Sequence, residues 1–257
     1  MERQPLTSRI HHHARRPTPR RPRPPCHAAR RPGADRVEEI FLGERTFRIE
    51  RPDESDKLLA HPGVRGAIPG EVYVPYWTDL WPAARMLGKW ILRQRWPAGL
   101  AALEVGCGLG LPGLAALSMG VDVTFSDYDS TALHFVRRNA LINGLPEPKT
   151  LQLDWRFPPA GVQFPILLAA DLIYEQRHVA PLIRLIRRML APTGVCLLTD
   201  QDRVPSSLLR RQLADAGLPF TTRMLRAGEP GGTRYKGTLY RITQPGGTDP
   251  LLEDRRE

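Results

Sequence analysis

Four acidic residues, each at the end of an apolar stretch, are the residues of this 257-residue chain best placed to do chemistry. They are Glu104, Asp127, Asp154 and Asp171, and the stretch before each is expected to form a strand. In a sheet of parallel strands, ligands bind outside the carboxyl ends of the strands. Carboxylates gathered there accept hydrogen bonds from hydroxyl groups and attract cations. We therefore predict an acid-lined pocket.

Glycines fill the turn between the strand that holds Glu104 and the helix expected after it. Gly106, Gly108 and Gly110 follow the apolar run 100–105 directly. Glycine has no Cβ, so it lets a ligand approach the main chain closely. A glycine-rich turn between a strand and a helix is typical of nucleotide-cofactor binding. An ordinary tight turn would explain the glycines but not this context.

Two kinds of cofactor fit the turn. The segment Gly108–Gly113 matches the G-x-G-x-x-G pattern of dinucleotide-binding domains, and Asp127 stands near the position of their ribose-binding acid. A dinucleotide is disfavoured, because the Glu104 carboxylate would face its negatively charged pyrophosphate. A cofactor with an amino-acid end and no phosphate suits Glu104 better, because a carboxylate attracts an ammonium group directly or through water. Together the four acids favour a cationic sulfonium cofactor.

Strands and helices alternate along the chain, which indicates an α/β fold. Five strands are expected near residues 100–105, 121–127, 149–153, 164–170 and 194–199. Helices are expected near residues 80–95, 114–119, 130–143, 178–190 and 206–216. Such alternation gives a doubly wound parallel sheet. The last two strands, near 220–225 and 238–242, are joined by a loop alone and should pair antiparallel. We predict a mostly parallel, seven-stranded Rossmann-like sheet with an antiparallel C-terminal strand pair.

Helix caps follow from the residues in front of the apolar faces. Thr78 or Asp79 is expected to cap the helix near 80–95, with Pro82 in its first turn. Asp129 or Ser130 is expected to cap the helix near 130–143.

The chain divides into four parts by composition. Residues 1–36 form an Arg/Pro-rich tail that should be disordered, because proline density forbids helix and sheet and like charges repel. Residues 37–70 hold a predicted hairpin and a loop, residues 71–245 the main domain, and residues 246–257 a flexible C-terminal tail. For the N-terminal tail, a nucleic-acid arm, a transit peptide, an overextended translation start and an inert tail remain open.

Charge and cysteine content exclude several classes of function. The tail holds ten of the 37 Lys and Arg residues and two of the 27 Asp and Glu residues, so residues 37–257 carry a net charge of only +2. The domain itself therefore gives no basis for nucleic-acid binding. The three cysteines, Cys26, Cys107 and Cys196, lack metal-ligand spacing and fit a reducing cytoplasm. We predict neither a membrane span nor a metal site.

Several motifs of the chain resemble those of a known family. Glu104–Gly110 resembles the first motif of S-adenosyl-L-methionine-dependent methyltransferases with a seven-stranded sheet. Tyr76–Ala84, Leu153–Trp155 and Asp171–Glu175 resemble motifs of the methyltransferase-16 family of protein lysine methyltransferases. The likeness is closest to the branch that methylates the β subunit of the electron-transfer flavoprotein, which has a Pro-Tyr-Trp element and an Asp-x-x-Tyr motif. The resemblance covers about Val72–Pro245.

The resemblance implies S-adenosyl-L-methionine as cofactor and assigns a contact to each of its parts. Glu104 and the glycines would take the methionine end, Asp127 both ribose hydroxyls, and Asp154 the adenine amine with Trp155 beside the ring. Trp81 resembles the cofactor-contacting tryptophan of the family, although Trp81 and Trp155 could both be packing residues. The expected cofactor contacts are Trp81, Glu104, Gly106, Gly108, Gly110, Asp127, Tyr128, Asp154, Trp155 and Ala170.

Asp171 and Tyr174 are the predicted catalytic residues. In methyl transfer a neutral amine attacks a methyl group on a cationic sulfur, and a lysine amine with a pKa near 10.4 must first lose a proton. Asp171 could orient the arriving ammonium, and Tyr174 could attract the cation through its ring. The alternative for Asp171 is a helix cap. Glu175 is a weaker candidate, and His134 and His178 receive no role.

We therefore predict a cytoplasmic, monomeric S-adenosyl-L-methionine-dependent methyltransferase that acts on a lysine of a protein substrate. The choice of lysine comes from the resemblance alone. A small-molecule N-methyltransferase of the same fold is one alternative, because a fold does not determine a function. A non-catalytic or RNA-associated binding module that uses residues 1–36 is another.

Overall fold

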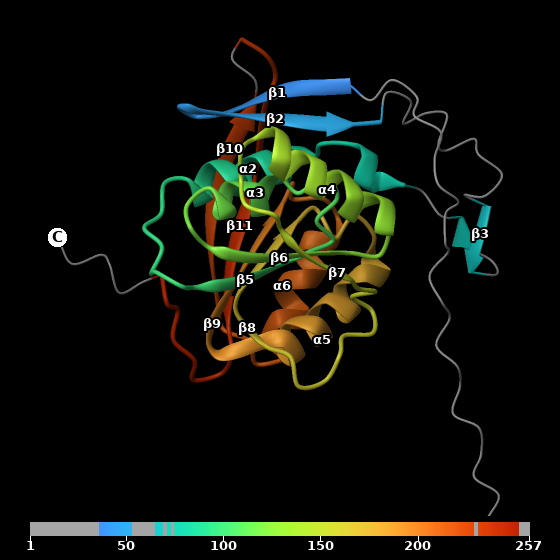
Figure 1. Cartoon of the computed structure of the whole chain (residues 1–257). Coiled ribbons are helices and arrows are strands. Elements are labelled where there is room, and N and C mark those ends of the chain that lie inside the picture. Colours follow the sequence, from blue (N-terminus) through green and yellow to red (C-terminus); the bar gives the residue numbers. More distant parts are fainter. Residues whose placement is uncertain (1–35, 53–64, 69–70, 73–74, 229–230, 252–257) are drawn as a thin grey trace, which may run out of the picture.

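A seven-stranded sheet forms the centre of the molecule in the computed structural model, which describes residues 36–52, 65–68, 71–72, 75–228 and 231–251 (Figure 1). The strand order is β10-β11-β9-β8-β5-β6-β7. Neighbours among β5 to β9 pair in parallel, whereas β11 pairs antiparallel with both β9 and β10. The strands are β5 (Ala101–Val105), β6 (Asp122–Asp127), β7 (Lys149–Gln152), β8 (Phe164–Ala170), β9 (Leu190–Asp200), β10 (Phe220–Gly228) and β11 (Arg234–Thr243). The predicted fold class is confirmed.

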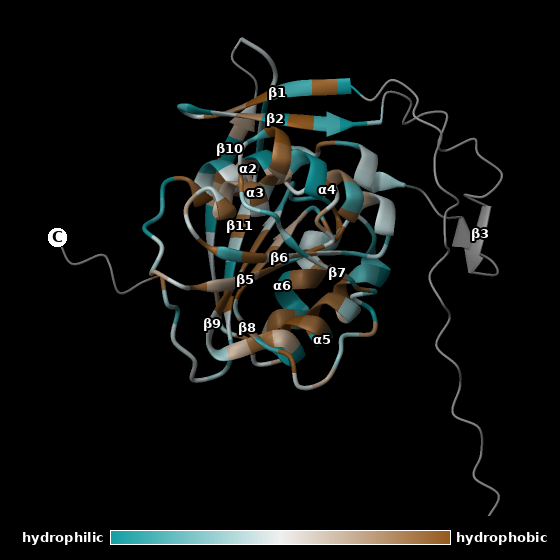
Figure 2. Ribbon diagram, viewed as in Figure 1, coloured by the Kyte–Doolittle hydropathy of each residue, from teal (hydrophilic) through white to brown (hydrophobic). Residues whose placement is uncertain are grey.

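Helices cover both faces of this sheet (Figure 1). On one face lie α2 (Pro82–Ile91), α3 (Leu111–Leu117) and α4 (Ser130–Ile142), and on the other lie α5 (Val179–Met189) and α6 (Pro205–Asp215). The central strands are apolar along their length because both faces are buried, as Figure 2 shows by their brown colour. Within the described residues, no helix is long and apolar enough to cross a membrane.

The strand order places a binding crevice at the ends of β5 and β8. From β5 the chain runs outward through β6 to β7, then returns to the other side of β5 as β8. The two strands are neighbours, but the helices that follow them, α3 and α5, cover opposite faces of the sheet. The gap between the two connections is where open α/β sheets bind ligands. Glu104 and Asp171 lie on the two sides of this gap.

The predicted hairpin is present: β1 (Arg36–Leu42) and β2 (Arg45–Arg51) pair antiparallel and pack over α2 and α4 (Figure 1). Asn139 of α4 is fully buried and joins this hairpin to the domain. Its Oδ1 accepts the N–H of Glu50 at 2.7 Å, and its Nδ2 donates to the carbonyls of Glu50 at 3.2 Å and Leu109 at 3.1 Å. Asn139 thus connects the hairpin to the glycine turn.

Of two short strands, β3 (Arg65–Ile68) lies in the segment predicted as loop, and β4 (Glu71–Val72) follows that segment. The predicted N-terminal tail lies outside the described residues apart from Arg36. The prediction of a flexible end is wrong for residues 246–251. Buried Asp249 accepts from Nε of Arg241 at 2.9 Å, and Leu251 joins the core, because this arginine on β11 supplies a partner for the carboxylate.

The structure changes the predicted boundaries of the helix near 80–95. Neither Thr78 nor Asp79 caps it, because residues 76–78 form the short 3-10 helix η2 (Tyr76–Thr78) and α2 begins at Pro82. The helix ends at Ile91, where the indole N–H of Trp96 donates to the Ile91 carbonyl at 3.1 Å and closes the last turn. The predicted cap of α4 is confirmed at Asp129, whose carboxylate accepts the N–H of Thr131 at 2.8 Å.

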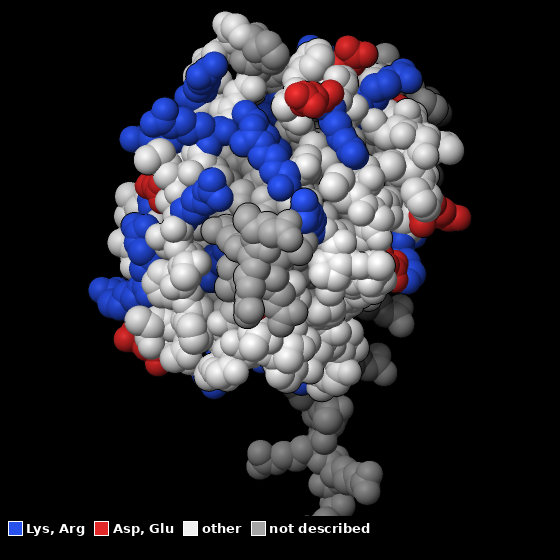
Figure 3. Space-filling model, turned by 90° about the vertical axis from the view of Figure 1, so that its left-hand side faces the viewer, with Lys and Arg blue, Asp and Glu red and all other residues white. Residues whose placement is uncertain are grey.

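Basic side chains gather on one side of the molecule, although the net charge of the domain is small. β10 is the last strand of the sheet, so one of its edges has no partner strand within the described residues. Figure 3 shows this side of the molecule, on which Lys and Arg outnumber Asp and Glu. Charge on an edge strand discourages edge-to-edge aggregation. The exposed basic residues of β10 and its neighbour β11 are Arg223, Arg226, Arg234 and Lys236.

Asn139→Ala should lower the free energy of unfolding by about 2–4 kcal/mol, because it leaves buried backbone groups of Glu50 and Leu109 without partners. Urea denaturation measures this loss. Asn143→Ala is the matched control, since Asn143 bonds the same strand at Arg48 from a more exposed position. Its cost should be about 1 kcal/mol. Equal costs for the two variants would contradict the role given to Asn139.

Candidate active site

A cavity of about 740 Å³ lies at the carboxyl ends of β5, β6 and β8. The segment before α2 and the residues after β7 and β9 complete its wall. It is lined by every residue that the sequence singled out, namely Trp81, Glu104, Gly106, Gly108, Gly110, Asp127, Tyr128, Asp154, Trp155, Ala170, Asp171 and Tyr174. The structure therefore brings the predicted residues together, while their individual roles stay predictions.

The glycine turn needs glycine at Gly108 for its backbone conformation. Its φ of 52° lies in the left-handed region, which other residues rarely adopt. A Cβ there would lie in ordinary van der Waals contact, at 3.4 Å, with the backbone oxygen of Trp77. The segment 75–81 therefore lies directly against the turn, and the two together form one wall of the cavity.

Glu104 is buried at the end of β5, with 2 % of its surface exposed. Its Oε2 accepts the N–H of Gly113, in the first turn of α3, at 3.1 Å. Burial raises the pKa of the carboxyl well above its usual value, while the bond from Gly113 lowers it and the nearby Asp127 raises it further. Glu104 thus holds the turn in place, and a cationic ligand beside it would favour its ionised form.

Asp127 ends β6 and binds the glycine turn through its side chain. Its Oδ2 accepts the N–H of Gly108 at 2.9 Å, and its Oδ1 accepts the N–H of Asp129 at 2.9 Å. Burial raises its pKa from 3.8 to about 6, against the lowering effect of these bonds. A carboxylate has about four acceptor positions, so acceptor capacity remains for a ligand hydroxyl.

The Asp154 carboxylate has less free capacity to accept hydrogen bonds than the sequence suggested. Its two oxygens accept from Nε and Nη2 of Arg156 at 2.8–3.1 Å, and Oδ1 also accepts the Arg156 N–H at 3.0 Å. An adenine amine would have to share this carboxylate. The Arg156 guanidinium also lies 5.8 Å from the ring centre of Tyr128. This arginine was not singled out, although the pattern Asp-x-Arg shows it within reach.

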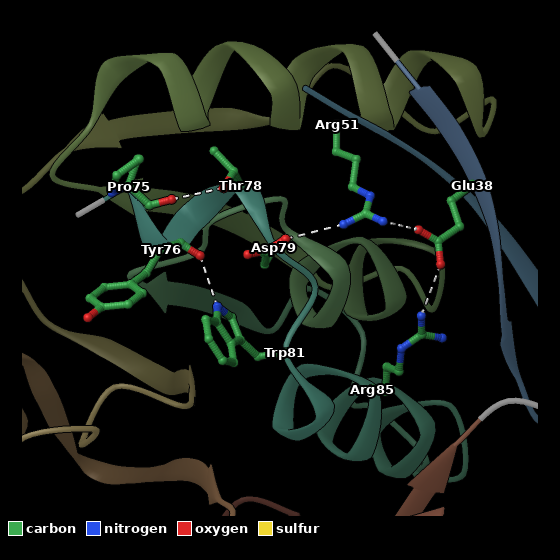
Figure 4. Close-up of polar contacts among 8 residues, drawn as sticks. All are labelled: Glu38, Arg51, Pro75, Tyr76, Thr78, Asp79, Trp81 and Arg85. Carbon is green, nitrogen blue, oxygen red and sulfur yellow. Dashed lines mark hydrogen bonds and ion pairs between the residues drawn. The ribbon is translucent and has the colours of Figure 1, made fainter. Parts of the chain in front are cut away.

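Anchors from several elements hold the segment 75–81 over the glycine turn. The indole N–H of Trp77 donates to Oδ2 of Asp129 at 2.9 Å, and its ring packs on Phe135 of α4. Figure 4 shows the opposite end, where the Trp81 indole N–H donates to the Tyr76 carbonyl at 2.9 Å. The anchors therefore reach from α4 to the start of α2.

Ion pairs tie the N-terminal hairpin to the same segment. Arg51 of β2 contacts Asp79 at 3.3 Å and Glu38 of β1 at 3.1 Å, and Arg85 of α2 contacts Glu38 at 3.4 Å (Figure 4). A single exposed ion pair stabilises little, but a network of several has more effect. The hairpin thus acts as a support for the cavity wall.

Asp171, directly after β8, has an unusual backbone and two side-chain partners. Its φ is 60°, a left-handed conformation that is uncommon for a residue other than glycine and often marks a functional site. Its Oδ2 accepts from Nε2 of Gln201 at 2.5 Å, and its Oδ1 forms an ion pair with the guanidinium of Arg203. Both partners follow β9. The carboxylate is therefore buried but balanced by a cation.

Aromatic rings line the cavity beside Asp171. The Tyr174 ring lies 4.8 Å from Tyr76 and 4.4 Å from His178, and His178 lies 5.6 Å from Trp155. Burial raises the pKa of Tyr174 to about 12, so its hydroxyl stays neutral at ordinary pH. The expectation that His178 has no place in the site is wrong, because its position at the start of α5 turns it into this cluster.

Sequence reasoning did not single out Gln201 and Arg203. They follow β9, and only the parallel pairing of β8 with β9 brings them to Asp171. The signal that could have found them is their position, because β9 is the next strand whose carboxyl end reaches the site.

Comparison with known proteins gives matches over the same part of the chain. The profile of a family described as lysine methyltransferase matches residues 77–212, just over half of the chain. The histidine protein methyltransferase 1 homolog of Dictyostelium discoideum is 34 % identical over 110 residues, or 40 % of this chain and 36 % of that protein. The histone-arginine methyltransferase METTL23 of Mus musculus is 32 % identical over 148 residues, or 53 % of this chain and 56 % of that protein.

Solved structures share the fold. The crystal structure of ribosomal protein L11 methylase from Lactobacillus delbrueckii subsp. bulgaricus superposes with a TM-score of 0.51 at 18 % identity. The match covers 63 % of this chain and 79 % of that one. At this identity the likeness concerns the architecture alone.

Gly113→Ala should lower the free energy of unfolding by about 2–3 kcal/mol, because the added methyl would overlap Oε2 of Glu104 and the ring of Phe125. Thermal or urea denaturation measures the change. Gly120→Ala is the control, since Gly120 has a φ of 84° and open space around its Cβ position. It should lose only about 1 kcal/mol of backbone strain. A smaller loss for Gly113→Ala than for Gly120→Ala would contradict the close packing described.

Proposed function

Because the chain belongs to the lysine methyltransferase family, we propose that it transfers a methyl group from S-adenosyl-L-methionine to a nitrogen atom of a protein side chain. The observation that carries this proposal is that two buried acids, Glu104 and Asp127, line the same cavity as several aromatic rings. Because the matched regions span only 36 % and 56 % of the two relatives, activity and substrate are argued from the site itself.

The residues of the cavity fit this cofactor. Burial raises the pKa values of Glu104 and Asp127, because water no longer solvates their ionised forms. A bound cation and hydroxyl donors would replace this solvation. The glycine turn and Glu104 would hold the methionine end, and Asp127 the ribose. Trp155 and Tyr128 would flank the adenine, with Asp154 and Arg156 at its polar edge.

When bound, the cofactor supplies a methyl group on a cationic sulfur. Transfer would form the N–C bond from the lone pair of the acceptor nitrogen and would leave the electron pair of the C–S bond on the sulfur. The acceptor then loses its extra proton to water. The protein contributes position and a dry channel rather than covalent chemistry. Tyr76, Tyr174 and His178 form the walls of this channel, and Asp171 lies at its base.

We propose lysine as the acceptor. The family description supports lysine, and the aromatic rings suit an alkylammonium, whose cation they attract. The two relatives described above are named for histidine and arginine, so acceptor analysis is part of the test. As the finer assignment we propose the branch that methylates the electron-transfer flavoprotein β subunit, on the likeness of Pro75–Trp77 and Asp171–Tyr174. Free buried Cys107 and Cys196 suit a reducing compartment such as the cytoplasm.

The test is incubation of the protein with methyl-labelled cofactor and a dialysed cell lysate, followed by separation of protein-bound from small-molecule label. Acid hydrolysis of the labelled protein then identifies the methylated amino acid. We expect label in protein as methyl-lysine. Label confined to small molecules, or no transfer at all, would overturn the proposal.

Binding of S-adenosylhomocysteine should depend on pH through Asp127. The ionised carboxylate accepts from the ribose, and its pKa is about 6 rather than 3.8, so affinity should be constant above about pH 7 and fall as pH drops below about 6. Asp127→Asn should bind roughly tenfold to a hundredfold more weakly and show a flat profile. Calorimetry measures both. An unchanged pH dependence in Asp127→Asn would assign the titration to another group.

Asp171→Ala should keep affinity for S-adenosylhomocysteine and lose transfer by about a hundredfold or more, because the acceptor is no longer positioned. Calorimetry and the labelling assay give the two readouts. Glu175→Ala is the control on the same segment, since Glu175 pairs with Arg177 rather than with Asp171. Full transfer by Asp171→Ala would remove Asp171 from the catalytic assignment.

A further inference from the structure

Arg203 occupies a position that the proposed reaction does not by itself explain. It follows β9, lines the cavity, and its guanidinium pairs with Oδ1 of buried Asp171. Gln201 takes the second carboxylate oxygen at 2.5 Å. The residue expected to receive the acceptor amine is thus already matched with a fixed cation.

A bare carboxylate at this position would oppose the chemistry. An opposite charge within about 4–6 Å favours the charged form of a group by about 1–3 pKa units. An unpaired Asp171 would therefore hold the lysine as an ammonium, which has no lone pair. The ammonium must lose its proton to water before the nitrogen attacks, so a stronger hold on the proton slows transfer at neutral pH.

We propose that Arg203 is a positioning residue that neutralises Asp171, so that the carboxylate orients the acceptor amine without keeping it protonated. This inference rests on the proposed function. It concerns the proton on the acceptor and not the binding of the cofactor.

The other charged groups near Asp171 on its own side of the cavity do not replace Arg203. Glu175 and Arg177 pair with each other at 2.8 Å. Tyr174 is neutral because its pKa is raised to about 12, and His178 packs against the Tyr174 ring. Glu175 and Arg177 are thus matched with each other, while the guanidinium of Arg203 pairs with the carboxylate of Asp171.

The acids from the neighbouring strands have partners of their own. Asp200 accepts from Ser206 and from the N–H of Asp202, and the carboxylate of Asp202 accepts from Thr238 at 3.0 Å. Glu104 and Asp127 accept from backbone N–H groups. Arg203 is thus the cation that balances Asp171.

The test uses n-butylamine as a mimic of the lysine side chain, titrated at neutral pH into the complex with S-adenosylhomocysteine. Arg203→Gln should bind n-butylammonium about tenfold more tightly than the wild type, the equivalent of one pKa unit. Arg203→Lys keeps the positive charge and should bind as weakly as the wild type. Arg203→Gln combined with Asp171→Asn should lose the gain.

Arg177→Gln is the matched control, because it removes a cation that lines the same cavity and pairs with Glu175. Its amine affinity should stay within about twofold of the wild type. In the labelling assay, the rising limb of the pH–rate profile of Arg203→Gln should move up by about one unit. A structural role alone would lower transfer by the same factor at every pH.

Unchanged amine affinity in Arg203→Gln, or an equal gain in Arg177→Gln, would overturn the role of Arg203 and leave the proposed function intact. Absence of transfer by the wild type would overturn the proposed function, while the amine titration would still report whether Arg203 neutralises Asp171. The two failures are therefore distinguishable.

Discussion

Two carboxylates buried at the ends of neighbouring strands, Glu104 on β5 and Asp127 on β6, are the constraint on which the site depends. A buried carboxylate is costly unless it is hydrogen-bonded, and here the N–H groups of Gly113 and Gly108 supply the bonds. The bonds that stabilise the acids also fix the glycine turn. Both acids still have raised pKa values, so a cationic ligand with hydroxyl groups is the partner that this arrangement favours.

The second constraint is the segment 75–81, which cannot pack on its own. Trp77 bonds to the cap residue of α4, and Arg51 ties Asp79 to the N-terminal hairpin. Asn139 completes the connection by joining this hairpin to the glycine turn. The hairpin lies before the matched region 77–212, yet it stabilises the wall that carries the aromatic channel. Its contribution to the site is therefore support rather than chemistry.

The sequence predicted those parts of the site that depend on local order. Strand ends, the glycine turn and the Asp129 cap are patterns within a few residues, and the structure has all of them. The pairing of Asp171 with Arg203 depends on which strands are neighbours, so no local pattern contains it. The predicted start of α2 near residue 80 was wrong, because residues 76–78 form the separate helix η2 with backbone hydrogen bonds of its own. The helix α2 begins only at Pro82. The packing of residues 246–251 was not predicted, because no local pattern shows that the segment after β11 folds back so that Asp249 binds Arg241 of that strand.

The most direct test of this account is a competition titration of the wild-type protein with S-adenosyl-L-methionine and with NAD at pH about 7.5, where Asp127 is ionised. Glu104 inside the turn should attract the amino-acid end of the first ligand and repel the pyrophosphate of the second. The account predicts saturable binding of S-adenosyl-L-methionine that NAD does not displace. Binding of NAD, or its displacement of S-adenosyl-L-methionine, would contradict the account, because the glycine turn would then be a dinucleotide site.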